Sequence, residues 1–192
     1  MDEVLVLSCS PRRGGNADFA AELVLEAFGG SGRIMRPADG GIGPCRSCGR
    51  CEAVPGTCSI AGDGADAVFE AMFSVPLTVF VSPVYFYHLP AQAKALVDRM
   101  QRWWAVPEAE RPGRGRMLAP VLFGARRKGV RLFEGSLLTL KYAAAAAGMA
   151  LCPASLAYGL EGPSDLRRDE AAREALRQAA AAWRAAAIPE RG

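Results

Sequence analysis

Two kinds of apolar pattern alternate along the chain: short continuous runs, and segments with apolar residues at helical spacing. Short runs rich in β-branched and aliphatic residues are typical of strands, and they occupy 4–7, 77–81, 119–123 and 149–156. The segment 33–36 is a further candidate strand, which is short and has charged ends. Between these runs, apolar residues recur every three or four positions. This spacing predicts helices at 17–28, 65–73, 90–104 and 136–148, and a last one that begins at Ser164 or Asp165 and ends before Pro189. Strands that alternate with helices predict an α/β fold, a doubly wound sheet of five parallel strands in a single domain.

The first of these strands leads into a polar loop. Ser8, Ser10, Pro11, Gly14 and Gly15 are turn-forming residues, and Asn16 is expected to be the N-cap of the helix that follows. A helix N-terminus offers free N–H groups and a positive dipole end, which suits a phosphate. Arg12 and Arg13 add positive charge to the loop.

The spacing of this loop excludes two common phosphate motifs. It lacks the Gly-Lys-Ser/Thr ending of a P-loop and the three-glycine spacing of a dinucleotide fingerprint. A hydroxyl-rich loop of this kind suits a terminal monophosphate such as that of FMN. An ordinary polar connection between a strand and a helix would have the same composition, so both interpretations stand at this point.

A second candidate loop follows the most apolar strand, 77–81. Ser82-Pro83 ends that strand, and the segment 84–88 places Tyr85, Phe86 and Tyr87 directly after it. Ligands of doubly wound sheets lie beyond the carboxyl ends of the strands, which selects the loops 8–16, 82–88 and 124–135. Flat apolar side chains suit a planar heteroaromatic ring. A subunit interface or a rim of the core is the alternative.

Four of the six cysteines gather in one segment, at Cys45, Cys48, Cys51 and Cys58. The compact spacing of the first three is that of ferredoxin-type cluster ligands. Zinc would favour two pairs with a longer spacer, and without a secretory signal disulfides are less expected. Reduced thiols without a metal are the remaining alternative. We expect Cys9 and Cys152 to be small buried residues.

Length and charge narrow the function classes. With 192 residues, one domain over 1–192 is the simplest count, with the cysteine-motif loop 44–62 inserted after the second strand. A net charge of +3 without a concentrated basic face argues against a nucleic-acid partner. The apolar stretch 143–160 is interrupted by glycine and proline, so we expect no membrane span and a cytoplasmic protein.

Three features together resemble one known family. They are Ser8-x-Ser10-Pro11-Arg12-x-Gly14-x-Asn16, the cysteine run, and Ser82-Pro83-Val84-Tyr85-Phe86 followed by Ala91 to Asp98-Arg99. This arrangement resembles the flavodoxin-like NADPH-dependent FMN reductases, and among them the iron–sulfur flavoprotein branch. The resemblance spans most of residues 4–104, whereas the last ninety residues are similar only in pattern.

The resemblance implies where the cofactors lie. The FMN phosphate and ribityl chain would contact Ser8, Ser10, Pro11, Arg12, Gly14, Gly15 and Asn16, and the flavin ring would contact Ser82, Pro83, Val84, Tyr85 and Phe86. A 4Fe–4S cluster would bind Cys45, Cys48, Cys51 and Cys58. Asp98-Arg99 would be a structural or interface pair, and a homodimer or homotetramer is expected.

The expected function is therefore an FMN-dependent oxidoreductase that passes electrons from NAD(P)H to a flavin, quinone or similar small-molecule acceptor. The alternative is an electron carrier between FMN, a 4Fe–4S cluster and a ferredoxin-type partner. Because the flavin carries the chemistry, no catalytic side chain is expected. His88 is expected to be structural or exposed, with a proton donor near the flavin as the alternative. The segment 126–128, Arg-Arg-Lys, is interpreted as a solvated loop, with the 2′-phosphate of NADPH or an acidic electron carrier as its alternative ligand.

Overall fold

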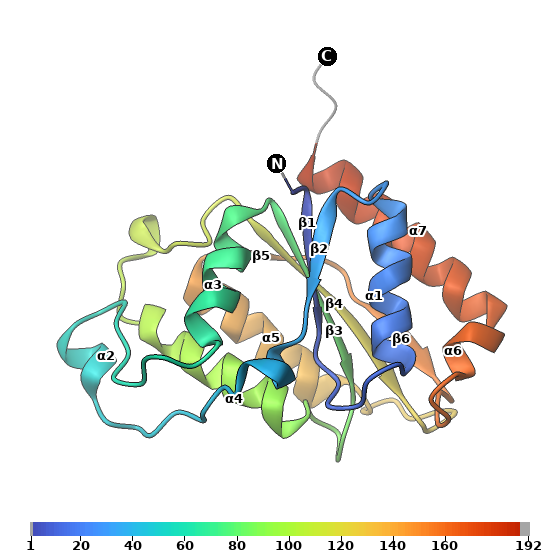
Figure 1. Ribbon diagram of the computed structural model, residues 1–192, viewed down its shortest axis with the longest axis horizontal. Helices are drawn as coiled ribbons and strands as arrows, with labels where there is room; N and C mark the ends of the chain where they lie inside the picture. The colour runs from blue at the N-terminus through green and yellow to red at the C-terminus, as the bar shows by residue number, and fades with distance from the viewer. Residues whose placement is uncertain (1, 189–192) are drawn as a thin grey trace.

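The computed structural model describes residues 2–188 and contains one twisted, parallel sheet (Figure 1). Its long strands are β1 (Val4–Ser8), β2 (Gly32–Met35), β3 (Leu77–Pro83) and β4 (Met117–Gly124). They lie in the order β2-β1-β3-β4, and two short strands, β5 (Ala150–Leu151) and β6 (Ser155–Tyr158), both pair with β4. This order of strands is that of flavodoxin-like folds, so the predicted fold class is confirmed.

The last strand differs from the prediction, which was a single strand at 149–156. Instead, β5 pairs with the start of β4, where Ala150 lies beside Met117, and β6 pairs with its end, where Tyr158 lies beside Gly124. Pro153 lies between them and has no N–H to donate to a ladder. Six strands therefore occupy five positions in the sheet, because β5 and β6 follow one another along the same side of β4.

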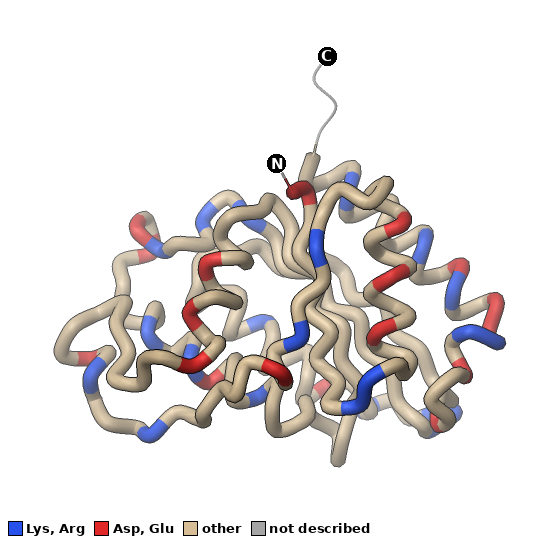
Figure 2. Tube along the Cα trace, viewed as in Figure 1, with Lys and Arg blue, Asp and Glu red and all other residues tan. Residues whose placement is uncertain are grey.

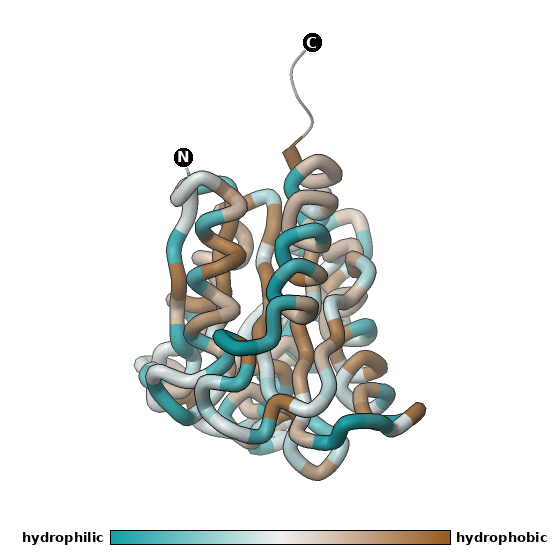
Figure 3. Tube along the Cα trace, turned by 90° about the vertical axis from the view of Figure 1, so that its right-hand side faces the viewer, coloured by the Kyte–Doolittle hydropathy of each residue, from teal (hydrophilic) through white to brown (hydrophobic). Residues whose placement is uncertain are grey.

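Two layers of helices cover the sheet. α1 (Asn16–Ala27) and α7 (Glu170–Ala187) pack on one face, and α3 (Ala65–Ser74), α4 (Ala91–Arg99) and α5 (Glu134–Ala147) on the other (Figure 1). Successive side chains of β1 point to opposite faces of the sheet. Val4 and Val6 therefore pack in the core under α1, and Leu5 and Leu7 pack in the core under α3 and α4. Hydrophobic segments accordingly run along the strands between the layers (Figure 3).

Short helical turns complete the connections. They are the 3₁₀ helices η1 (Pro37–Gly40), η2 (Met100–Trp103) and η3 (Glu108–Glu110), and the short helices α2 (Arg50–Ala53) and α6 (Asp165–Arg168). The predicted last helix is thus divided into α6 and α7, because Asp169 leaves the helical conformation and caps α7 by accepting from Ala172 N at 3.0 Å.

Three details of the helix ends also differ from the predictions. Gly15 rather than Asn16 is the N-cap of α1, and Pro90 is the N-cap of α4 rather than its first turn. An α-helix over the predicted range 90–104 would place Trp104 on the same buried stripe as Met100, but Trp104 is exposed and Trp103 is buried. η2 is a 3₁₀ helix with three residues per turn, so the residue that lies on the same face as Met100 is Trp103 and not Trp104.

The surface of the described residues carries mixed charge. Basic and acidic positions are interspersed on the face that Figure 2 shows. Across residues 2–188, no helix is long and apolar enough to cross a membrane.

Candidate functional site

A cavity of about 180 Å³ lies beyond the carboxyl ends of β1, β3 and β4. The loop after β1 forms one wall, and the start of the aromatic loop after β3 forms another. The lining residues are Ser10, Arg12, Gly15, Asn16, Ala17, Pro83, Val84, Tyr85, Phe123, Gly124, Ala125, Leu160, Glu161, Gly162 and Pro163. The two loops that the sequence selected for a phosphate and a ring thus meet at one cavity.

The start of α1 is open to an anion. Its N-cap is Gly15, whose lack of a side chain leaves the first-turn N–H groups without a side-chain cap. Gly15, Asn16 and Ala17 all line the cavity. Arg12 adds an exposed guanidinium at its wall. The positive end of a helix dipole and a cation therefore face the same space.

An ion pair behind the loop holds its shape. Asp18 accepts from Ser8 Oγ at 2.5 Å and from Gly14 N at 2.6 Å, and it pairs with Arg36. Arg36 also donates to the carbonyl oxygens of Ser10 at 3.0 Å and Arg12 at 3.2 Å. The hydroxyl of Ser8 and the N–H of Gly14 are thus already bonded inside the protein, and neither residue lines the cavity.

Asn16 joins the loop to the end of the chain. Its side-chain Nδ2 donates to Gly162 O at 2.9 Å, and its Oδ1 accepts from Leu166 N at 3.1 Å. These bonds hold the segment 160–163 against the cavity. Sequence reasoning missed this segment, although it follows β6 and obeys the same carboxyl-end rule as the other loops.

The aromatic loop reaches the cavity through its first residues. Val84 donates its N–H to Phe123 O at 2.8 Å, and Val84 and Tyr85 line the wall. Of the predicted ring-contact residues, Ser82 and Phe86 do not line it: Ser82 is buried beneath, and Phe86 is wholly exposed. Pro11 of the first loop is also outside the cavity lining and exposed.

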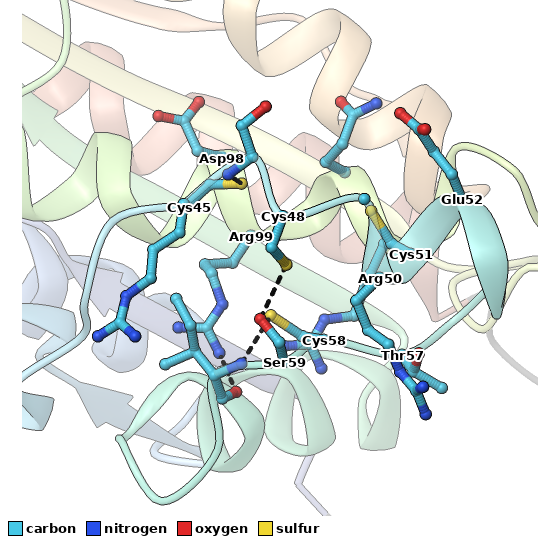
Figure 4. A pocket seen from close by; sticks show the side chains of 16 residues that line it. Cys45, Cys48, Arg50, Cys51, Glu52, Thr57, Cys58, Ser59, Asp98 and Arg99 are labelled. Atoms are coloured by element: carbon cyan, nitrogen blue, oxygen red, sulfur yellow. Dashed lines mark hydrogen bonds between the residues drawn. The ribbon is translucent and has the colours of Figure 1, made fainter.

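A second cavity, of about 170 Å³, holds all four cysteines of the segment 44–62 (Figure 4). The segment follows β2 and η1, carries α2, and ends just before α3. Arg99, Gln101 and Arg102, from the end of α4 and from η2, close the other side. Cys45 and Cys48 are exposed, and Cys51 and Cys58 are half-buried. The fold therefore brings the four predicted ligands to one place.

Local hydrogen bonds reach three of these thiols. Cys48 Sγ and Ser59 Oγ are 2.9 Å apart, and this hydrogen bond lowers the pKa of Cys48. Cys45 Sγ accepts from Ser47 N at 3.4 Å, and Cys58 Sγ accepts from Ile60 N at 3.5 Å. Within residues 2–188, no three such side chains converge as they would on a single metal ion. Four separate thiols suit a multinuclear cluster, in which each binds a different iron atom.

A buried guanidinium closes the base of the cysteine segment. Arg99, whose side chain is 0% exposed, donates to Gly43 O at 3.3 Å, Ile60 O at 2.8 Å and Asp63 Oδ2 at 2.7 Å. It therefore joins the residues on either side of the four cysteines. The resemblance implied that Asp98-Arg99 is a structural or interface pair; Arg99 makes these buried contacts, whereas Asp98 pairs with Lys94 on the surface.

The other two cysteines are buried, as expected. Cys9 is 1% exposed and Cys152 is 5% exposed. Burial raises the pKa of both thiols, which keeps them protonated and unreactive.

A family model and curated relatives match long stretches of this chain. The family model described as NADPH-dependent FMN reductase matches residues 3–157. An iron–sulfur flavoprotein of Methanocaldococcus jannaschii is 33% identical over 100 residues, which are 50% of this chain and 51% of that protein. The match thus spans about half the length of the curated relatives.

Solved structures share the fold. An NADH:FMN oxidoreductase in its apo form has a TM-score of 0.65 at 16% identity, over 99% of this chain and 92% of that one. A WrbA-like flavodoxin protein from Agrobacterium tumefaciens has a TM-score of 0.65 at 15% identity, over 100% of both chains. Since the family model covers most of the chain, the chain belongs to the NADPH-dependent FMN reductase family.

Proposed function

We propose that the chain binds FMN at the carboxyl ends of its strands and uses it to pass electrons from NAD(P)H to a flavin, a quinone or a similar small acceptor. The observation that carries the proposal is the cavity that joins the uncapped start of α1 to the aromatic loop after β3. One wall offers N–H donors and Arg12 to a phosphate. The opposite wall offers Val84 and Tyr85 to an apolar ring.

The side chains would bind and orient the cofactor. Arg12 would balance the phosphate charge, Ser10 and the N–H groups of Asn16 and Ala17 would donate to its oxygens, and Pro83 and Val84 would exclude water from the ring. Hydride and electron transfer belong to the chemistry of FMN when it is bound. No protein acid or base is assigned, because the flavin itself carries the reaction.

The cysteine cavity favours a second candidate function, an electron carrier. Cys45, Cys48, Cys51 and Cys58 would hold a 4Fe–4S cluster, which when bound would supply one-electron transfer. The curated relatives are named iron–sulfur flavoproteins. Exposed Arg46 and Arg50 at the cavity rim would attract an acidic partner of the ferredoxin type.

The assembly of this chain into a homodimer or a homotetramer stays a prediction.

The visible spectrum of protein purified without oxygen, with iron and sulfide assayed on the same sample, separates the two functions. Flavin bands without iron would support the reductase. Flavin bands with iron and sulfide in matching amounts would support the carrier. A colourless protein that takes up no added FMN would contradict both.

A substitution tests the phosphate wall directly. Ser10 lines the cavity and is 5% exposed, so Ser10→Glu places a carboxylate against the phosphate and should abolish FMN binding. Gln178→Glu adds the same charge to the exposed face of α7 and should leave FMN content unchanged. If Ser10→Glu protein carries wild-type amounts of FMN, the phosphate does not lie at this wall.

A further inference from the structure

The aromatic loop after β3 is a two-residue turn in an unfavourable conformation. Tyr85 N donates to His88 O at 2.8 Å, and His88 N donates to Tyr85 O at 3.0 Å. The two residues between them, Phe86 and Tyr87, have φ angles of +50° and +64°. Turns of this kind normally use Asn-Gly, because other side chains clash with the backbone in the left-handed region. Such a turn persists only where its surroundings hold it.

His88, the one histidine of the sequence, is bonded through both ring nitrogens. Its Nδ1 lies 2.9 Å from Leu89 N, whose N–H can only donate, so Nδ1 is the unprotonated nitrogen. Nε2 then carries the hydrogen and donates to Thr139 Oγ1 of α5 at 3.0 Å. The neutral ring therefore connects the end of the turn to the neighbouring helix.

The first turn of α5 is shaped to receive this ring. A Cβ added at Gly135 would lie 2.8 Å from Tyr87 O and 3.2 Å from His88 Cδ2, so glycine permits the close approach. On the outer side, the guanidinium of Arg126 lies 5.4 Å from the centre of the Tyr87 ring. The tip of the turn, Phe86, is wholly exposed.

We propose that His88 is a positioning residue for the flavin ring. Its two ring hydrogen bonds hold the strained turn, and the turn holds Tyr85 at the cavity wall through the paired backbone bonds between Tyr85 and His88. The inference rests on the proposed FMN site, because Tyr85 lines that cavity. Loss of either ring bond lets the turn relax, which moves Tyr85 and weakens the contact with the cofactor.

A double-mutant cycle tests this inference. In Thr139→Val the acceptor of Nε2 is lost, and in His88→Asn the bond to Thr139 is lost while an acceptor for Leu89 N remains. Each variant should raise the dissociation constant of FMN by roughly 3- to 10-fold, the range that one hydrogen bond contributes. Because both variants remove the same bond, the double variant should be no weaker than His88→Asn alone. The circular dichroism of the bound flavin should change in all three.

A control lies one turn away on the same helix. Ser136 is buried and its hydroxyl has no hydrogen-bond partner among the described residues, so Ser136→Ala should keep wild-type FMN affinity and flavin dichroism. The melting temperature of each apoprotein identifies any variant that fails to fold, and Thr139→Val leaves the turn sequence itself intact.

The outcomes separate this inference from the FMN site on which it rests. Wild-type protein that binds no added FMN would overturn both. Wild-type protein that binds FMN, with unchanged affinity and dichroism in Thr139→Val, would overturn the role of His88 alone. Additive losses in the double variant would also overturn it, because the two residues would then act separately.

Discussion

The substitution Asp63→Asn leaves the buried guanidinium of Arg99 without its carboxylate partner. The Arg99 side chain is 0% exposed and that of Asp63 is 13% exposed, with 2.7 Å between Nη1 and Oδ2. Asp63 also accepts from Gly43 N and from Ala65 N, each at 3.1 Å. The substitution therefore affects both ends of the cysteine segment as well as the start of α3.

The size of the effect follows from the unpaired charge. Removing one partner of a buried ion pair costs about 3–5 kcal/mol. We expect a value near 3 kcal/mol, because the asparagine oxygen still accepts one hydrogen bond and Arg99 keeps its carbonyl acceptors. For a chain of this length that corresponds to a fall in melting temperature of about 6–12 °C.

The assay is urea unfolding of the reduced apoprotein, followed by circular dichroism. The midpoint should fall while the slope m stays constant, since the surface exposed on unfolding does not change. Asp98→Asn is the matched control: Asp98 pairs with Lys94 on the surface, with side chains 40% and 37% exposed, and such pairs contribute about 1 kcal/mol or less. A loss in Asp63→Asn no larger than in Asp98→Asn would refute the reasoning.

The same pair predicts a dependence on pH. Burial of Asp63 opposes its ionisation, but the hydrogen bonds from Arg99 and from two backbone N–H groups outweigh it and lower the pKa of Asp63. The stabilisation by the Asp63–Arg99 pair is therefore fully present at pH values above the pKa of an aspartate in the unfolded chain, about 3.9. It is lost as the pH falls through the lower pKa that Asp63 has in the folded protein. At pH values below the pKa of Asp63 in the folded protein, wild type and Asp63→Asn should therefore have similar free energies of unfolding.

Three further results are expected. Tyr85→Ala should weaken FMN binding or change the flavin redox potential; if titration and potentiometry find neither, the aromatic loop is not at the ring. Asp169→Ala removes the cap of α7 and should cost about 1 kcal/mol in urea unfolding, and an unchanged midpoint would contradict that role. In native protein, iodoacetamide should spare Cys9 and Cys152, because burial raises the pKa of both thiols, and mass spectrometry showing either alkylated first would disprove this.

Local patterns determined the elements and their order. The apolar runs at 4–7, 77–81 and 119–123 became β1, β3 and β4, because a strand buried on both faces needs apolar residues at successive positions. Alternation of strands with helices then left few arrangements that bury every apolar face. The sequence also placed both candidate cofactor loops after strands, since their turn residues are adjacent along the chain.

Contacts between distant residues had no such local signal. Only the folded chain pairs Asp18 with Arg36 behind the phosphate loop and directs Arg99 to Asp63 rather than to its neighbour Asp98. The same applies to the bond between His88 and Thr139, which lie 51 positions apart. Helix and strand periods report which face of an element is buried, but they carry no information on which residue lies opposite. Which residues lie opposite one another depends on the order and register of the strands, and these contacts between distant residues determined the shape of both cavities.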